Sequence, residues 1–207
     1  THAPIEQSGQ IISQLKNFGS VDLKPYGIHS NPPSFIINTG DMTEFGEEGW
    51  PAYLEFWKGI KINRYDVLGN HDNTWGSLRD KLRDEQGAPY YSFDTLGCHF
   101  MILESATVQD PLPSFSQEQI NWIKNDLKKL PPDKPIFLCF HHPLDSNEYV
   151  SAFERYRLLE LFQSYNLACI LVGHGHSARY FDFNGFDAVE GGSSFGSKPG
   201  FNLITIS

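Results

Sequence analysis

The chain has 207 residues, of which 40% are hydrophobic and 20% charged, and its formal net charge is -9. A chain of this length can bury the core of one domain, and its acidic balance disfavours a nucleic-acid-binding surface. No apolar run reaches the roughly 18 residues that cross a bilayer. The three cysteines, Cys98, Cys139 and Cys169, are not spaced as pairs, so we expect buried free thiols.

Helices and strands alternate through the first half of the chain. Apolar residues at helical spacing predict a helix over residues 7–18, and short apolar runs predict strands over 34–38 and 64–68. An aromatic-rich helix is predicted over 47–58 and a short helix over 75–84. This order of elements indicates an α/β fold.

The second half begins with a predicted strand pair over 90–93 and 98–104. Ser116 predicts the start of a helix, with Gln119 as its capping-box partner. The remaining predictions are strands over 135–140, 167–172, 179–183, 187–190 and 201–206, and a helix over 152–165. Strands that alternate with helices and then follow one another predict layers of mixed sheets and helices.

Four short polar motifs each follow a predicted strand. They are Gly40-Asp41, Gly69-Asn70-His71-Asp72, His141-His142-Pro143 and Gly173-His174-Gly175-His176. Each alone can be a plain turn or a hydrogen-bonded histidine. In α/β proteins, however, ligands bind at the carboxyl ends of strands, so four such ends would gather these side chains at one place. Carboxylate, amide and imidazole groups together predict a metal site without thiolate ligands.

This set of ligands suits the hydrolysis of phosphate esters. A bridging carboxylate can hold two cations about 3.5–4 Å apart, where they share a hydroxide that attacks phosphorus in line with the leaving group. Imidazole and amide ligands add no negative charge, so the metal pair can still attract a phosphate. A histidine beside the metals can protonate the departing oxygen.

The ordered motifs G-D, G-N-H-D, H-x-P and G-H-x-H resemble those of the calcineurin-like metallophosphoesterases. The branch of bacterial cyclic-nucleotide and glycerophosphodiester phosphodiesterases is closer, and the purple acid phosphatases are more distant. Tyr90-Tyr91-Ser92-Phe93-Asp94, followed by residues 98–105, is similar to that branch as well, and the resemblance spans residues 2 to about 201. It implies a four-layer αββα sandwich of two mixed β-sheets flanked by helices.

The resemblance also implies roles for particular residues. Asp41 would bridge two metal ions, and Asn70, His141 and His174 would complete one metal site. His2 and His176 would belong to the second site, His71 would assist the leaving group, and Asp72 would orient His71. His142 would lie outside the set of ligands. The cofactors would be two divalent or mixed-valence ions of manganese, iron or zinc.

The family pattern also opens with a strand ending in Asp-x-His, whereas this chain opens with Thr1-His2. The matching aspartate would therefore stand immediately before Thr1, and the first strand would be missing. We expect residues 1–207 to be a single domain that is truncated at both ends. The alternative for His2 is a terminal residue without a role.

We therefore predict a metal-dependent hydrolase of small phosphate esters, with phosphodiesters favoured over phosphomonoesters. The alternatives are a protein-binding scaffold on the same fold that has lost its chemistry, or a nuclease. Asp145, Glu148 and Tyr149 either approach the substrate or lie in a solvated loop, which we favour. No nucleic acid or membrane partner is expected. The protein would be soluble, either cytoplasmic or exported with a removed leader, and its oligomeric state stays open.

Overall fold

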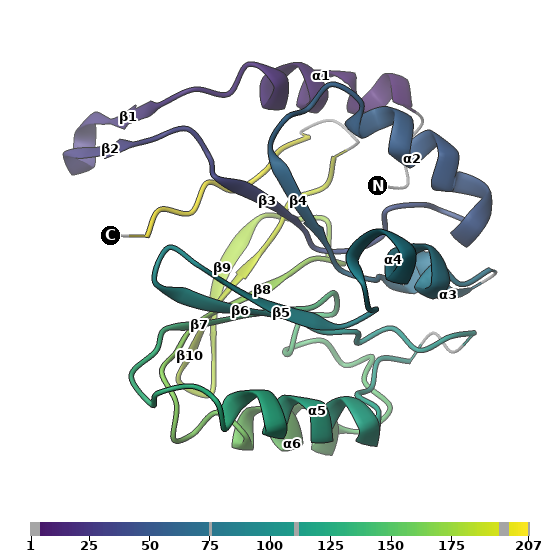
Figure 1. Ribbon diagram of the computed structural model, residues 1–207, viewed down its shortest axis with the longest axis vertical. Coiled ribbons are helices and arrows are strands. Elements are labelled where there is room, and N and C mark those ends of the chain that lie inside the picture. The colour runs from purple at the N-terminus through teal and green to yellow at the C-terminus, as the bar shows by residue number, and fades with distance from the viewer. Residues whose placement is uncertain (1–4, 75, 110–111, 195–198, 207) are drawn as a thin grey trace.

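The computed structural model describes residues 5–74, 76–109, 112–194 and 199–206 (Figure 1). The helices are α1 (Ile5–Lys16), α2 (Trp50–Trp57), α3 (Asn70–Thr74), α4 (Arg79–Gln86), α5 (Gln117–Leu127) and α6 (Ala152–Glu160), with 3-10 turns at Lys24–Tyr26 and Gly46–Gly49. The strands are β1 (Val21–Leu23), β2 (Ile28–Ser30), β3 (Phe35–Asn38), β4 (Asn63–Asp66), β5 (Tyr91–Thr95), β6 (Cys98–Ile102), β7 (Ile136–Cys139), β8 (Leu167–Val172), β9 (Arg179–Phe183) and β10 (Phe186–Glu190).

The main sheet has six strands in the order β5-β6-β7-β8-β10-β9. β6, β7, β8 and β10 run parallel, whereas β5 and β9 pair antiparallel at the two edges. A second sheet consists of β3 and β4, which are parallel, and β1 and β2 form a separate hairpin. Helices cover the outer sides, with α1 and α2 beside β3 and β4, and α5 and α6 beneath the main sheet (Figure 1).

The alternation of side chains along the central strands builds two cores. Met101, Leu138 and Ile170 point toward α5 and α6 and belong to one buried cluster. Their neighbours in the chain, such as Phe100 and Phe137, point the other way and pack with Phe35 and Tyr65 of the second sheet. β7 and β8 are therefore apolar on both faces, which is why they read as continuous apolar runs in the sequence.

The predicted α/β sandwich is confirmed, and most strands lie where the sequence pattern placed them, β8 and β9 to the residue. Two predictions are wrong. Residues 201–206 form no regular strand. The helix predicted over 75–84 corresponds to α4, which begins only at Arg79, and a separate helix that was not predicted, α3, begins within the Gly69-Asn70-His71-Asp72 motif.

The predicted start of α5 is confirmed, because the Ser116 hydroxyl accepts a hydrogen bond from the Gln119 backbone N–H at 3.1 Å. The side chain of Gln119 does not close a capping box in the expected way. It bonds both backbone groups of Glu104, which ties α5 to the end of β6.

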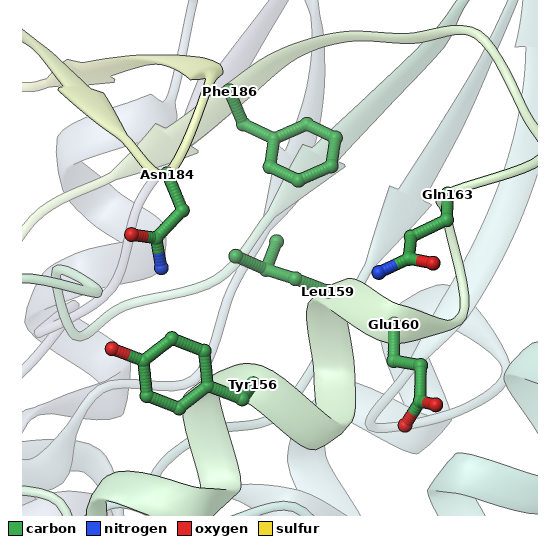
Figure 2. Close-up of a pocket in the computed structure, with 6 residues that line it drawn as sticks. All are labelled: Tyr156, Leu159, Glu160, Gln163, Asn184 and Phe186. Carbon is green, nitrogen blue, oxygen red and sulfur yellow. The ribbon is translucent and has the colours of Figure 1, made fainter.

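In the part of the chain that the structure describes, no helix combines the length and the apolar character needed to cross a bilayer. The three cysteines are free thiols, and Cys98 and Cys139 are buried as expected, whereas Cys169 is half-buried. A cavity of about 240 Å³ lies between α6 and the β9–β10 turn, at the end of the sheet where β10 begins (Figure 2). The four polar motifs follow the opposite ends of their strands, so this cavity is separate from them. Its lining residues are Tyr156, Leu159, Glu160, Gln163, Asn184 and Phe186.

Candidate metal centre

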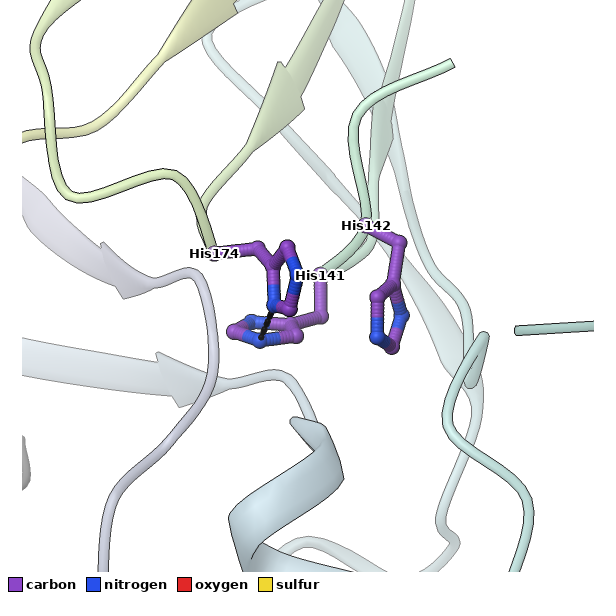
Figure 3. A group of neighbouring side chains, drawn as sticks. All are labelled: His141, His142 and His174. Atoms are coloured by element: carbon purple, nitrogen blue, oxygen red, sulfur yellow. Dashed lines mark hydrogen bonds between the residues drawn. The ribbon is translucent and has the colours of Figure 1, made fainter. Parts of the chain in front are cut away.

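The candidate site lies where β3, β4, β7 and β8 end. Asp41, Asn70, His141 and His174 each come from the loop or helix that follows one of these strands. Figure 3 shows the rings of His141 and His174 close together, with His142 beside them. Residues more than a hundred positions apart in the chain thus meet at one edge of the structure, as Asn70 and His174 do.

The loops reach this place through backbone conformations that most residues avoid. Asp41 has φ 54° and His174 has φ 73°, both in the left-handed region. Non-glycine residues are strained there, and such strain gathers at functional sites. Two glycines permit close packing beside them, because a Cβ on Gly40 would collide with the His141 ring and one on Gly69 would collide with Asp41.

Four polar atoms of this site are close neighbours. Asn70 Oδ1 lies 3.1 Å from His141 Nε2 and 3.2 Å from His174 Nδ1. The two imidazole nitrogens are 3.2 Å apart, and Asp41 Oδ2 lies 3.3 Å from His141 Nε2. Asp41 and His141 are buried, so these contacts are shielded from bulk solvent.

The hydrogen bonds of the outer ring nitrogens show which nitrogen of each imidazole carries the proton. His141 Nδ1 lies 2.7 Å from the carbonyl oxygen of Thr39, which can only accept, so its proton is on Nδ1. His174 Nε2 lies 2.6 Å from Glu148 Oε2, so its proton is on Nε2. Two neutral imidazoles therefore turn lone pairs toward the oxygens of Asn70 and Asp41. Four lone-pair donors with no proton among them fit a divalent cation.

Burial and the neighbouring charges shift the pKa values of the two rings in opposite directions. Burial lowers the pKa of His141, but the adjacent Asp41 carboxylate raises it, and the net shift is upward. Burial and the proximity of His141 lower the pKa of His174.

His71 stands beside this group at the start of α3. Its backbone N–H donates to Asp41 Oδ1 at 3.1 Å, so this carboxylate anchors the start of α3. Its ring Nδ1 lies 3.2 Å from the carbonyl oxygen of Glu44, which accepts the Nδ1 proton and orients the ring. The sequence pattern did not indicate Glu44, because a backbone carbonyl leaves no trace in residue type.

Asp72 joins two of the loops. Its Oδ2 accepts from the Gly69 N–H at 2.8 Å and its Oδ1 from the Thr43 N–H at 2.9 Å. The carboxyl group is fully buried, and burial together with the nearby Asp41 charge raises its pKa to about 6. These bonds hold the loops of Asp41 and Asn70 together. The orienting of His71 by Asp72 stays a prediction.

His142 is also fully buried, and its backbone N–H and ring Nδ1 both lie within hydrogen-bonding distance of the Ser105 hydroxyl, at 3.2 Å and 2.9 Å. Burial and the neighbouring imidazoles of His141 and His174 lower its pKa well below the usual value. Nitrogens of these three rings lie within 4.8 Å of one another. Ser105 engages only Nδ1 of the ring, and Nε2 is buried without a hydrogen-bond partner among the described residues. We propose that the cation lies among Asp41, Asn70, His141 and His174, because their ligand atoms are separated by only 3.1–3.3 Å.

Two histidines, His2 and His176, were predicted for a second metal position. His176 follows His174 by two residues, has φ 61°, and its side chain is exposed. His2 lies outside the described residues. The loop after His142 differs from the solvated segment we expected, because Tyr149 is buried, Glu148 contacts His174 and Asp145 pairs with Arg179.

Known proteins resemble this chain over much of its length. A probable glycerophosphodiester phosphodiesterase of Arcobacter nitrofigilis is 28% identical over 116 residues, which are 54% of this chain and 42% of that protein. A 3',5'-cyclic adenosine monophosphate phosphodiesterase of Haemophilus influenzae is 25% identical over 178 residues, 81% of this chain and 63% of that one. The chain thus spans about half the length of these relatives.

The fold has solved counterparts as well. A purple acid phosphatase from yellow lupin superposes with a TM-score of 0.59 at 17% identity, covering 98% of this chain and 42% of that one. The family model described as calcineurin-like phosphoesterase matches residues 2–178, which include all four motifs. The chain therefore belongs to the calcineurin-like phosphoesterase family, a class of metal-dependent phosphoesterases, as its motifs predicted.

Proposed function

We propose that the protein hydrolyses phosphate esters with a pair of metal ions, and that phosphodiesters are its better substrates. The observation that carries the proposal is the convergence of Asp41, Asn70, His141 and His174, whose neighbouring lone-pair atoms are separated by 3.1–3.3 Å. Bound divalent cations supply Lewis acidity and charge neutralisation for displacement at phosphorus.

The ligands leave the site positively charged when cations are bound. Asn70 and the two histidines contribute neutral donors, and Asp41 contributes one negative charge. Two divalent cations would exceed the negative charge of these ligands, so a phosphate ester is attracted although the whole chain has a net charge of -9. Asp41 turns one oxygen toward His141 and the other toward the His71 backbone, and we assign it the position between the cations.

His71 is the residue we assign to the leaving group. The Glu44 carbonyl holds one proton on Nδ1, so the second proton of the imidazolium is on Nε2. We propose that Nε2 donates this proton to the departing oxygen, a step that typically contributes 10²–10⁴-fold to the rate. His71 is bonded to Asp41 through its backbone, which keeps the ring at the edge of the metal centre.

The preference for diesters is supported by two relatives, a probable glycerophosphodiester phosphodiesterase and a cyclic adenosine monophosphate phosphodiesterase. The identity of the metal ions is proposed from the chemistry of the donor atoms. Oxygen and imidazole donors suit manganese, iron and zinc, and we propose that two of these ions are bound.

The test is a panel of small phosphomonoesters, phosphodiesters and cyclic nucleotides, assayed with Mn²⁺, Fe²⁺ or Zn²⁺ after the protein has been freed of metal by chelation. We expect hydrolysis that depends on added metal and is faster for diesters. His141→Ala should abolish it, whereas His29→Ala, which removes an exposed histidine of the β1–β2 hairpin, should not.

Two results would favour the rival functions. A chain that binds neither Mn²⁺ nor Zn²⁺ in equilibrium dialysis would be a scaffold on this fold. Cleavage of DNA faster than any small ester would indicate a nuclease, against the expectation from the acidic charge.

A further inference from the structure

The loop between β7 and α6 is fixed by its own hydrogen bonds beside the metal centre. The Tyr149 hydroxyl donates to the His142 carbonyl oxygen at 2.8 Å. Arg155 Nη1, from α6, donates to the carbonyl oxygens of Leu144 and Ser146 at 2.9 and 3.1 Å. The position of this loop therefore does not depend on the side chain of Glu148.

A second brace joins the same loop to the far strands of the main sheet. Arg179, at the start of β9, binds Asp145 through two parallel contacts of 2.6 and 2.8 Å. Its Nε donates to Glu190 Oε2, at the end of β10, at 2.6 Å, and Glu190 is buried. A bidentate guanidinium–carboxylate pair fixes direction as well as distance. The loop is thus held on two sides, and Glu148 extends from a rigid segment.

From this segment Glu148 reaches the outer face of His174. Its Oε2 lies 2.6 Å from His174 Nε2, while His174 Nδ1 faces Asn70 Oδ1 and His141 Nε2 at 3.2 Å each. A neutral imidazole carries one proton. A carboxylate on Nε2 keeps that proton there, leaves the lone pair on Nδ1, and fixes the rotation of the ring.

We propose that Glu148 is a positioning residue that holds His174 in the tautomer and orientation needed to bind a metal ion. This inference rests on the proposed function in one respect, namely that His174 Nδ1 is a metal ligand. Carboxylates that bind the outer nitrogen of a ligating histidine also raise its basicity, and their loss typically lowers metal affinity by 10–100-fold. The side chain of Glu148 is 54% exposed, so we expect about a tenfold loss.

The test measures metal affinity, not turnover. Metal-free parent, Glu148→Gln and Glu148→Ala proteins are titrated with Mn²⁺ and with Zn²⁺ by calorimetry, with a competing chelator for the tighter ion. We expect about a tenfold weaker site for Glu148→Ala and a smaller loss for Glu148→Gln, whose amide oxygen can still accept the Nε2 proton. Glu160→Gln makes the same change in charge at an exposed position of α6 and should bind metal like the parent.

Nitrogen NMR of the metal-free proteins separates tautomer control from simple loss of charge. His174 should show a protonated Nε2 and an unprotonated Nδ1 in the parent and in Glu148→Gln, and exchange between tautomers in Glu148→Ala. Parent-like metal affinity together with a parent-like His174 spectrum in Glu148→Ala would overturn the inference. If Glu148→Ala does not fold, a Glu148→Gln protein with affinity no weaker than that of Glu160→Gln overturns it.

The two proposals fail in different ways. A parent chain that binds metal through His174 but hydrolyses no ester would refute the proposed function without refuting the positioning role of Glu148. A parent chain that hydrolyses esters while Glu148→Ala retains its metal affinity and His174 tautomer would refute the inference alone.

Discussion

The buried carboxyl group of Glu104, which follows β6, allows the effect of burial on a pKa to be tested. It is 9% exposed, and its Oε1 accepts from Asn73 Nδ2 at 3.1 Å and lies 3.0 Å from Arg79 Nε. Burial outweighs the attraction of Arg79 and the bond from Asn73, and raises the pKa of the carboxyl group from 4.5 to about 7. The ionised form is therefore less favourable in the folded chain than in the unfolded one.

The sign and size of the effect follow from proton linkage. Between pH 4.5 and 7 the folded chain keeps a proton on Glu104 that the unfolded chain releases, so the free energy of unfolding falls as pH rises. The difference in pKa corresponds to about 3 kcal/mol at most. Glu104→Gln mimics the protonated side chain at every pH, and should match the parent near pH 4 and exceed its stability by up to about 3 kcal/mol at pH 8.

Urea denaturation of the chelator-treated proteins, followed by circular dichroism from pH 4 to pH 8, measures this difference. Glu160→Gln serves as the control, because it removes an exposed carboxylate from α6 and should run parallel to the parent. Parallel stability curves for the parent and Glu104→Gln over the whole range would falsify the claim that this carboxyl group is buried at a cost. A Glu104→Gln protein that is less stable than the parent at pH 8 would show that the ion pair with Arg79 dominates instead.

Three further predictions concern the site and one helix. His71→Ala should keep its metal, measured by elemental analysis, and should slow turnover by about 10²–10⁴-fold for a substrate with a poor leaving group. The control His29→Ala should change neither metal content nor turnover. Loss of metal from His71→Ala would show that His71 is a ligand. Asp41→Asn should empty at least one metal position, with the exposed Asp84→Asn as control, and unchanged metal content would contradict the assignment of Asp41 to both cations. Ser116→Ala should lower the free energy of unfolding by about 1 kcal/mol, because it removes the acceptor for the Gln119 N–H, and an unchanged urea midpoint would refute the importance of this cap.

The main strands could be predicted because their sequence signals are local, and the gathering of the motifs could be predicted from the expected parallel topology. β8 reads as a six-residue apolar run that ends at Gly173, and burial on both faces is what makes such a run continuous. The parallel arrangement then places Asp41, Asn70, His141 and His174 at one edge, which follows from topology and not from any single motif.

The features that the sequence did not indicate depend on tertiary contacts. α3 begins at Asn70, where Asn and His suggested a turn, and the backbone N–H of His71 is bonded to Asp41, thirty positions earlier. The contact of Glu148 with His174 likewise depends on a loop whose braces, Arg155 and Arg179, come later in the chain. Residues 201–206 have the composition of a strand, but composition does not supply a neighbouring strand to pair with.

The bond from His141 to the Thr39 carbonyl oxygen has a consequence for how the protein is made. It joins residues 102 positions apart, and Asn70 precedes His174 by 104. At a synthesis rate of 5–20 residues per second, about 5–20 s pass between the emergence of the earlier and later residues of the candidate site from the ribosome. During that interval the nascent chain carries Asp41 and Asn70 without their imidazole partners, so the candidate site is complete only after the residues that follow β8 have been translated.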